Sequence, residues 1–265
     1  MKEIVFDKGN SMQAANFVFK DYLARIGFVG EARADVASLR ALMRAQLFSV
    51  PFENLDVQAG KIVSLVPEDI VEKIVYQGRG GYCYEVNGLF AMALAALGID
   101  YELLGARPMF YPSRRPKTHM VLLVKLEGEE WICDLGFGSY GIRAPIGLHQ
   151  CQHILQQDDD RFQLLQPDGR DYVVQAWIDN VWVNQFSFDL YPQEWIDFMP
   201  VNYMNSTHPD TIFVQKLLVV LHTPAGRNIL VGDKLKQIEY GAVTERHLAE
   251  AEITPVLAKL FGLQV

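Results

Sequence analysis

The sequence lacks most of the features that mark secreted, membrane-bound and nucleic-acid-binding proteins. It has only three cysteines and no Cys-x-x-Cys pair, which argues against a disulfide framework and a zinc knuckle and suits a reducing cytoplasm. No apolar run reaches the roughly 18 residues of a membrane span, and the first residues lack the basic and apolar segments of a secretory signal. The net charge of -8 disfavours nucleic acid as the main partner. Any anionic cofactor must therefore find a local positive site.

The chain is ordinary in composition, and its residue pattern changes character near residue 100. Half of its 265 residues are apolar and 21% are charged, which is typical of a globular protein with one large domain or a few that share a core. Apolar residues recur at helical spacing before residue 100, whereas β-branched and alternating segments dominate afterwards. We therefore expect an α+β fold, with a helical bundle followed by an antiparallel meander that forms a small β-barrel.

The expected elements follow from apolar periodicity and from turn residues. The pattern predicts helices over 12–26 and 34–47, from Pro67 onward, and over 90–97, with strands over 101–106, 119–126, 130–135, 162–165, 172–178 and 181–188. It then predicts a short helix over 194–198, strands over 213–221 and 228–231, and a last helix over 245–261.

Cys83 stands at the point around which the chain is organised. Three glycines within residues 78–81 indicate a sharp backbone bend, and the apolar run 90–97 ends at Gly98 as a buried helix would. Cys83 thus falls where a turn enters the first turn of a buried helix. Unpaired N–H groups there favour a thiolate, so we expect a pKa below the ordinary value of about 8.5, with Arg79 as a nearby positive charge. The alternative is a buried structural cysteine; the setting favours a nucleophile.

A cysteine nucleophile needs a base and a group that orients the base. His119 opens an apolar strand and Asp134 ends the next one, so both lie where strands meet loops. Cys, His and Asp in this order are typical of papain-like and transglutaminase-like enzymes, although a single histidine before an apolar strand is often structural. A two-residue turn at residues 128–129 would place Asp134 opposite Leu123, about 13 Å along the strand from His119. The triad then requires a longer loop, a bulge or a sheared pairing.

Four segments together resemble the arylamine N-acetyltransferase family. They are Pro51-Phe52-Glu53-Asn54-Leu55, Arg79-Gly80-Gly81-Tyr82-Cys83, His119-Met120-Val121-Leu122-Leu123-Val124 and Cys133-Asp134-Leu135-Gly136-Phe137-Gly138. The resemblance runs from residues 22–27 to residues 205–209, and it departs from the usual Val or Ala at Leu135. It implies a Cys83–His119–Asp134 triad and acetyl-coenzyme A as donor. It also implies three parts with a cysteine-protease-like or transglutaminase-like core: a helical bundle (1–99), a β-barrel (100–199) and an α/β lid (200–265).

Candidate cofactor contacts gather around the same segments. Backbone N–H groups of Gly136, Phe137 and Gly138 can approach phosphate oxygens, although an ordinary turn has the same pattern. Thr118 and Thr207 are further candidates by resemblance. The basic residues Arg114, Arg115 and Lys117 form either a solvated loop or an attraction for the cofactor's phosphates. Arg79 and Glu53 are expected to pair and to stiffen the loop before Cys83.

The sequence also leaves a metal site and other uses of the cysteine as alternatives. His149, Cys151 and His153 would share one face of a strand, but no fourth ligand is apparent, so we expect no metal site. A thiol hydrolase or a transglutaminase-like amide-forming enzyme would use the same triad, and a binding module would leave Cys83 inert. The sequence favours a cytoplasmic acetyltransferase that is a monomer or homodimer, takes an aromatic amine or hydrazine as acceptor, and binds neither nucleic acid nor membrane.

Overall fold

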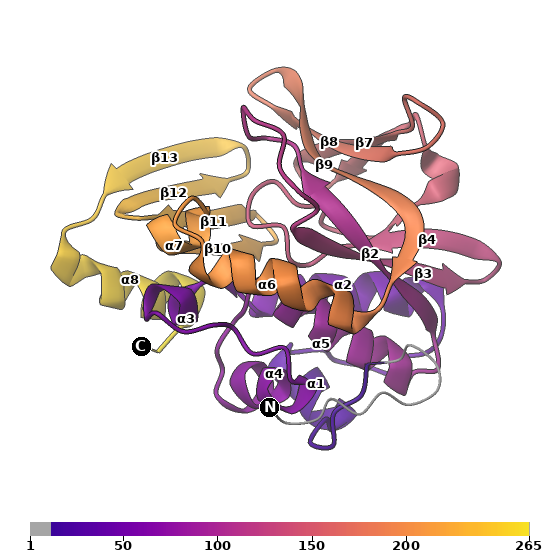
Figure 1. Ribbon diagram of the computed structural model, residues 1–265, viewed down its shortest axis with the longest axis horizontal. Helices are drawn as coiled ribbons and strands as arrows, with labels where there is room; N and C mark the ends of the chain where they lie inside the picture. The colour runs from indigo at the N-terminus through magenta and orange to yellow at the C-terminus, as the bar shows by residue number, and fades with distance from the viewer. Residues whose placement is uncertain (1–11, 265) are drawn as a thin grey trace.

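A computed structural model of the chain describes residues 12–264 and contains two antiparallel sheets and a set of helices (Figure 1). The larger sheet has eight strands in the order β5-β4-β3-β2-β9-β8-β7-β6, and the smaller has five in the order β1-β10-β11-β12-β13. The strands of the larger sheet are β2 (Asp100–Pro108), β3 (His119–Leu126), β4 (Glu129–Cys133), β5 (Ile146–Gly147), β6 (Ile154–Gln157), β7 (Asp160–Leu165), β8 (Tyr172–Ile178) and β9 (Val181–Gln193). Those of the smaller sheet are β1 (Phe52–Glu53), β10 (Leu218–Thr223), β11 (Gly226–Val231), β12 (Lys234–Glu239) and β13 (Ala242–His247).

The larger sheet is open rather than closed. Within the described residues its edge strands β5 and β6 do not pair with each other, so the sheet curls without forming the complete barrel that the sequence led us to expect (Figure 1). The three strands β2, β3 and β4 carry its most buried part, since residues 119–124 of β3 are all buried. This part of the sheet packs against the helix that carries Cys83.

Most helices of the first hundred residues gather below the larger sheet, whereas α3 (Leu55–Gln58) lies beside α8 (Glu250–Phe261) on the side of the smaller sheet (Figure 1). The others are α1 (Phe19–Arg25), α2 (Val36–Ser49), α4 (Pro67–Val71), a π-helical turn (Glu72–Tyr76) and α5 (Cys83–Ala96). Every residue of α5 from Cys83 to Leu94 is buried, as an apolar helix of this composition requires. Gly98 follows with a φ of +69°, which a glycine adopts readily and which lets the chain turn into β2.

The expected helix over 12–26 is wrong in its first half. Residues 12–18 are not helical, because tertiary partners satisfy their polar groups instead. The N–H of Met12 donates to the Tyr101 hydroxyl at 2.7 Å, and the N–H of Ala15 donates to the Glu68 carboxylate at 2.9 Å. The helical pattern is therefore realised only from Phe19 onward.

The last third differs most from the sequence-based expectation. The predicted last helix over 245–261 is split into β13 and α8 (Glu250–Phe261), and the unpredicted β12 forms a hairpin with β13. Tyr240 and Gly241 make its two-residue turn with positive φ angles. The expected strand over 213–221 begins only at Leu218, after α7 (Ile212–Gln215). The short helix expected over 194–198 becomes a 3-10 turn (Trp195–Asp197) that leads into α6 (Phe198–Thr207), and a second 3-10 turn spans Leu148–Gln150.

Two hydrophobic clusters hold these elements together. The larger joins buried residues from Met12 to Val220 and includes α5 and both faces of β3. The smaller joins Val219, Leu230, Leu235, Leu257 and Phe261, so α8 packs on the five-stranded sheet. The division at residues 99 and 199 stays a prediction. No helix in the described range is both long and apolar enough to cross a membrane.

Candidate active site

Cys83 is the first residue of α5, and its thiol faces a cavity. Its side chain is almost completely buried, and the sulfur lies 3.9 Å from the carbonyl oxygen of Thr118. The loop after β4 passes directly beneath it, because a Cβ atom on Gly136 would lie only 2.5 Å from the Cys83 Cα. Glycine at position 136 thus permits the backbone contact that brings this loop against the cysteine.

His119 and Asp134 form a buried pair beside this cysteine. His119 Nε2 lies 2.8 Å from Asp134 Oδ2, and both residues are less than 5% exposed. The structure therefore brings Cys83, His119 and Asp134 together around one site, since Cys83 and His119 also line the same cavity.

The register that joins His119 to Asp134 differs from the expected one. The hairpin turns at Glu127 and Gly128, both with positive φ, which is one residue earlier than predicted. Because Leu122 pairs with Cys133, the next position, Asp134, stands opposite Val121, which shares a strand face with His119. The expected separation was therefore wrong, and neither a bulge nor a longer loop is needed.

Asn87 was missed by the sequence analysis and connects the parts of the site. Its amide nitrogen donates to Asp134 Oδ1 at 3.1 Å and to the Met120 carbonyl at 2.8 Å. Its amide oxygen accepts from the N–H of Leu135 at 2.8 Å. Asn87 lies four residues after Cys83 and so on the same face of α5, a spacing that could have drawn attention to it.

Burial is the largest influence on the pKa of the Cys83 thiol, and it raises that pKa above its ordinary value. The Asp134 carboxylate raises it further, whereas the backbone N–H groups of Met120 and Tyr84 lower it. The expectation that the helix N-terminus and a nearby Arg79 lower the pKa of Cys83 is wrong, because desolvation outweighs the backbone N–H groups. A Cys83 thiolate accordingly needs a positive charge beside it, which a protonated His119 would provide.

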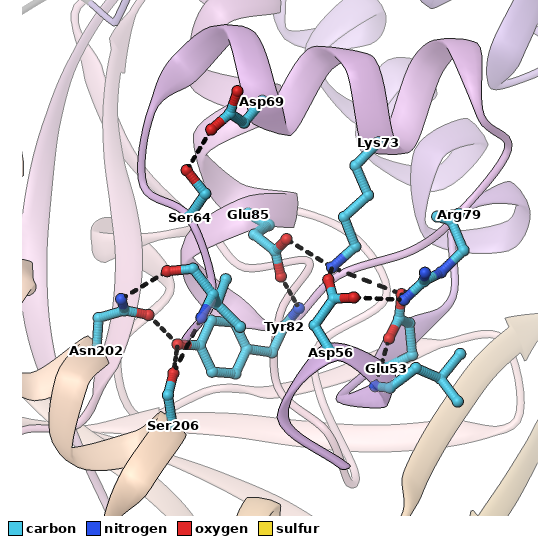
Figure 2. Close-up of polar contacts among 12 residues, drawn as sticks. Glu53, Asp56, Ser64, Asp69, Lys73, Arg79, Tyr82, Glu85, Asn202 and Ser206 are labelled. Carbon is cyan, nitrogen blue, oxygen red and sulfur yellow. Dashed lines mark hydrogen bonds and ion pairs between the residues drawn. The ribbon is translucent and has the colours of Figure 1, made fainter. Parts of the chain in front are cut away.

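Arg79 does not supply that charge. Its guanidinium contacts Glu53 at 2.8 and 3.0 Å and Asp56 at 3.5 Å, within a mostly buried charge cluster (Figure 2). Lys73 completes the cluster and lies 2.6 Å from Asp56 and 2.7 Å from Glu85. The expected Arg79–Glu53 pair is confirmed.

Glu85 links this charge cluster, defined by Glu53, Asp56, Lys73, Arg79 and Glu85, to the nucleophile helix. Its Oε2 accepts from the N–H of Tyr82, the residue before Cys83, at 3.0 Å and so caps α5 (Figure 2). Burial raises the pKa of Glu85 to about 7, although Lys73 opposes the rise. The charge cluster therefore fixes the start of the Cys83 helix through the hydrogen bond from the N–H of Tyr82 to Glu85.

The cavity in front of Cys83 has a volume of about 190 Å³, and several aromatic rings form part of its walls. Phe137 and Phe186 contact the His119 ring at centroid distances of 5.2 and 5.3 Å. Phe137 lines the cavity together with Phe52, Phe110, Tyr111 and Phe213, whereas Phe186 contacts the His119 ring without lining the cavity. A cavity of about 150 Å³ accommodates benzene in another protein, so this one admits a single aromatic ring with a small substituent.

Four of the five predicted cofactor residues line this cavity: Thr118, Gly136, Phe137 and Gly138. A Cβ atom on Gly138 would lie 2.7 Å from the Phe52 ring, so this glycine also permits close packing. Thr207, the fifth, is exposed on α6 and precedes the cavity-lining His208 by one residue. Its hydroxyl donates to the Tyr203 carbonyl at 2.7 Å.

The structure gives the histidines near residue 150 no shared ligand geometry. His149 belongs to a 3-10 turn and lies 3.0 Å from Glu129, whereas Cys151 and His153 follow in a bend rather than on a strand. Across residues 12–264, no group of three His, Cys, Asp or Glu side chains is arranged to hold a metal ion.

Comparison with known proteins gives consistent matches over most of the chain. A family model described as N-acetyltransferase matches residues 35–265. The arylamine N-acetyltransferase of Escherichia coli K12 is 35% identical over 94% of this chain and 89% of its own, and human arylamine N-acetyltransferase 1 is 30% identical over 92% and 93%. Among solved structures, the Nocardia farcinica arylamine N-acetyltransferase has a TM-score of 0.90 at 32% identity, covering 98% and 94% of the two chains. The Mycobacterium marinum enzyme in complex with CoA has 0.88 at 30%, covering 92% of each.

Proposed function

Because the chain belongs to the arylamine N-acetyltransferase family, we propose that it moves an acetyl group from acetyl-coenzyme A to an aromatic amine or hydrazine through an acetyl-cysteine at Cys83. The observation that carries this proposal is the buried His119–Asp134 pair, 2.8 Å apart, beside a cysteine that faces an aromatic cavity. The aromatic walls suit an arylamine ring, and the cysteine suits transient storage of the acetyl group.

In the first half reaction, the Cys83 thiol gives its proton to His119, and the thiolate attacks the carbonyl carbon of the acetyl thioester. The bond from that carbon to the coenzyme A sulfur breaks, and the departing sulfur takes the proton from His119. Asp134 holds Nε2 of the ring, which leaves Nδ1 to exchange the proton with Cys83. The carboxylate also stabilises the imidazolium that accompanies the thiolate.

In the second half reaction, the acceptor nitrogen attacks the acetyl carbon on Cys83. His119 takes a proton from the attacking amine and returns it to the Cys83 sulfur as the carbon–sulfur bond breaks. The thiol is thereby restored, and the acetylated amine leaves. Backbone N–H groups at the start of α5 are candidates for binding the oxygen of the tetrahedral intermediate.

Coenzyme A would approach through the cavity that Cys83 shares with the loop after β4. Thr118, Gly136, Phe137 and Gly138 are proposed as donor contacts because all four line that cavity. Thr207 remains a proposal from resemblance, supported by its place next to the cavity-lining His208. We propose a cytoplasmic location, since all three cysteines are free. We also propose that the reaction uses no metal.

A thiol hydrolase is the second candidate, because it would use the same three residues. Initial rates at several fixed acceptor concentrations distinguish the two functions. For the acetyltransferase, loss of acetyl-coenzyme A requires an arylamine, and the double-reciprocal plots are parallel, because each half reaction is complete before the next begins. Equal consumption without amine would indicate a hydrolase, and intersecting lines would indicate direct transfer without an acetyl-cysteine.

A further inference from the structure

The backbone carbonyl oxygen of Thr118 lies beside the Cys83 thiol and accepts hydrogen bonds from two helices. The Tyr84 hydroxyl of α5 donates to it at 2.8 Å, and the Asn205 amide of α6 donates to it at 3.2 Å. The Cys83 sulfur lies 3.9 Å from the same oxygen. Asn205 also donates to the Tyr84 hydroxyl at 3.4 Å, so the two side chains and the carbonyl form one connected network.

Both donors of this network are enclosed by the protein. Tyr84 is fully buried, and Asn205 is only 2% exposed. Burial raises the pKa of Tyr84 well above its ordinary value, so its hydroxyl keeps the proton that it donates. The rings of Tyr82 and Phe198 pack on the Tyr84 ring, each with its centre 5.4 Å away. These contacts hold the hydroxyl against the Thr118 oxygen.

The Thr118 oxygen affects the nucleophile through its partial negative charge. At 3.9 Å it favours the Cys83 thiol, which can donate a weak hydrogen bond, over the thiolate, which it repels. The Tyr84 O–H and the Asn205 N–H both point a positive hydrogen at this oxygen, and they offset part of that repulsion. The effect is strong in a buried site, because water does not screen it there.

The same carbonyl belongs to the peptide bond that joins Thr118 to His119. His119 is the first residue of β3 and pairs with Ala106 of β2, so the sheet fixes the backbone from this residue onward. Tyr84 and Asn205 supply hydrogen bonds to the residue just before the strand. The base and the environment of the sulfur are therefore fixed through one peptide group.

We propose that Tyr84 and Asn205 are positioning residues that make the Cys83 thiolate easier to form, through the hydrogen bonds that they donate to the Thr118 carbonyl oxygen. This inference rests on the proposed function and adds two residues that act through Thr118. Tyr84 is not among the residues that line the cavity, whereas Asn205 is. A change at Tyr84 therefore acts on the thiol without altering the cavity wall.

The experiment measures how the reactivity of Cys83 depends on pH in the full chain, for the parent, Tyr84→Phe and Asn205→Ala. Alkylation by iodoacetamide is followed on the Cys83 peptide by mass spectrometry, and acetylation by acetyl-coenzyme A is followed at pH 7 without acceptor. In Tyr84→Phe the rise of alkylation with pH should move upward by about 0.5 to 1 pH unit, and acetylation should slow by about 3- to 10-fold. Asn205→Ala should move the profile in the same direction.

Tyr22→Phe is the matched control for Tyr84→Phe. Tyr22 is a fully buried tyrosine of α1 whose hydroxyl donates to Gln46 Oε1 at 2.9 Å, so the same substitution removes one buried hydrogen bond elsewhere. It should lower stability in chemical unfolding and keep the pH profile and the acetylation rate of the parent.

A Tyr84→Phe profile that equals that of the parent, or that moves to lower pH, would overturn the inference and leave Tyr84 with a structural role only. If Tyr84→Phe does not fold, the profile of Asn205→Ala decides by the same criterion. In either case acetylation of Cys83 in the parent would leave the proposed function intact. Absence of acetylation in the parent would contradict the proposed function itself.

Discussion

Among single residues, Asp134 decides how the His119 ring is oriented. One of its oxygens contacts His119, and the other accepts from Asn87 and from the N–H of Gly136 at 2.9 Å. Asn87 is itself fully buried and also satisfies Met120 and Leu135. The orientation of the imidazole therefore depends on an amide that reaches neither substrate.

Asn87→Ala should lower the free energy of unfolding by about 2 kcal/mol, because it leaves buried polar groups without partners. It should also lower kcat/KM more than tenfold, because Asp134 loses a hydrogen bond that fixes it.

Asp134→Asn should also lower kcat/KM more than tenfold, since an amide favours the wrong imidazole tautomer. Chemical unfolding and initial rates provide the measurements.

Asn228→Ala is the control for Asn87→Ala. Asn228 is a buried asparagine of β11 whose amide donates to the Leu260 carbonyl at 3.3 Å, away from Cys83. Its loss should lower stability and leave kcat/KM unchanged. If Asn87→Ala loses stability and keeps full activity, Asn87 serves only the fold.

At the scale of the element, the start of α5 is held from two sides. The loop after β4 packs against Cys83 at Gly136, and the Glu85 carboxylate caps the helix by accepting from the N–H of Tyr82. The side chain of Lys73 is only 12% exposed, and its positive charge balances the carboxylates of Glu85 and Asp56. Its Nζ also lies 3.7 Å from a carboxylate oxygen of Glu53. The start of the nucleophile helix thus depends on the charge balance of the cluster that Glu85 connects to the N–H of Tyr82 (Figure 2).

Lys73→Met should lower stability by about 3 kcal/mol at pH 8, because it leaves buried carboxylates uncompensated. Burial raises the pKa of Glu85 from 4.5 to about 7, so the folded state holds this proton more tightly than the unfolded state. The favourable contribution of that proton is present at low pH and is lost as the pH rises through 7. Without Lys73 the pKa of Glu85 should rise further, so the deficit should be smaller at pH 6 than at pH 8.

Urea unfolding of the parent, Lys73→Met and Lys61→Met at both pH values tests this prediction. Lys61 is an exposed neighbour, and its loss should change stability by less than about 0.5 kcal/mol at either pH. A deficit in Lys73→Met that is equal at the two pH values, or larger at pH 6, would show that Glu85 is not the titrating group.

The sequence predicted the elements that carry the site better than the contacts between them. The helix of Cys83 and the strand over 119–126 are marked by long apolar runs, and both were predicted. The register of β3 on β4 was not predicted correctly. It depends on whether the hairpin turns at residue 127 or at residue 128, and the pattern of side chains does not decide between the two. The spacing of Asn87 from Cys83 places both on one face of the helix, but the partners of Asn87 could not be predicted, since they come from β3 and from the loop after β4. The β12–β13 hairpin was missed because β13 is exposed throughout and has no apolar alternation.

At the scale of the whole molecule, a charged contact joins the two sheets. Arg227 of β11 and Arg143 of the loop before β5 are both fully buried and contact Asp160 of β7. Arg143 also donates to the carbonyls of Gly226, at 2.9 Å, and Thr223. Asp160 and Arg143 therefore both contribute to the contact between the eight-stranded sheet and the five-stranded sheet, and Arg143 is also paired with Asp158 at 2.7 Å.

Asp160→Asn should lower the free energy of unfolding by about 3 kcal/mol, because two buried guanidinium groups lose their shared carboxylate. The exposed neighbour Asp159, changed to Asn, should have little effect. Calorimetry of both variants checks this. Equal melting temperatures for Asp160→Asn and the parent would mean that the contact does not couple the sheets.

We propose that Cys83 stores the acetyl group between donor and acceptor. To test this, the protein is mixed with acetyl-coenzyme A in the absence of amine, and the modified residue is identified by mass spectrometry of peptides. We expect one acetyl group on Cys83, none on the buried Cys133 or on Cys151, and its release as the acetylated amine when an arylamine is added. An acetyl group on another cysteine, or steady turnover with Cys83 never modified, would contradict it.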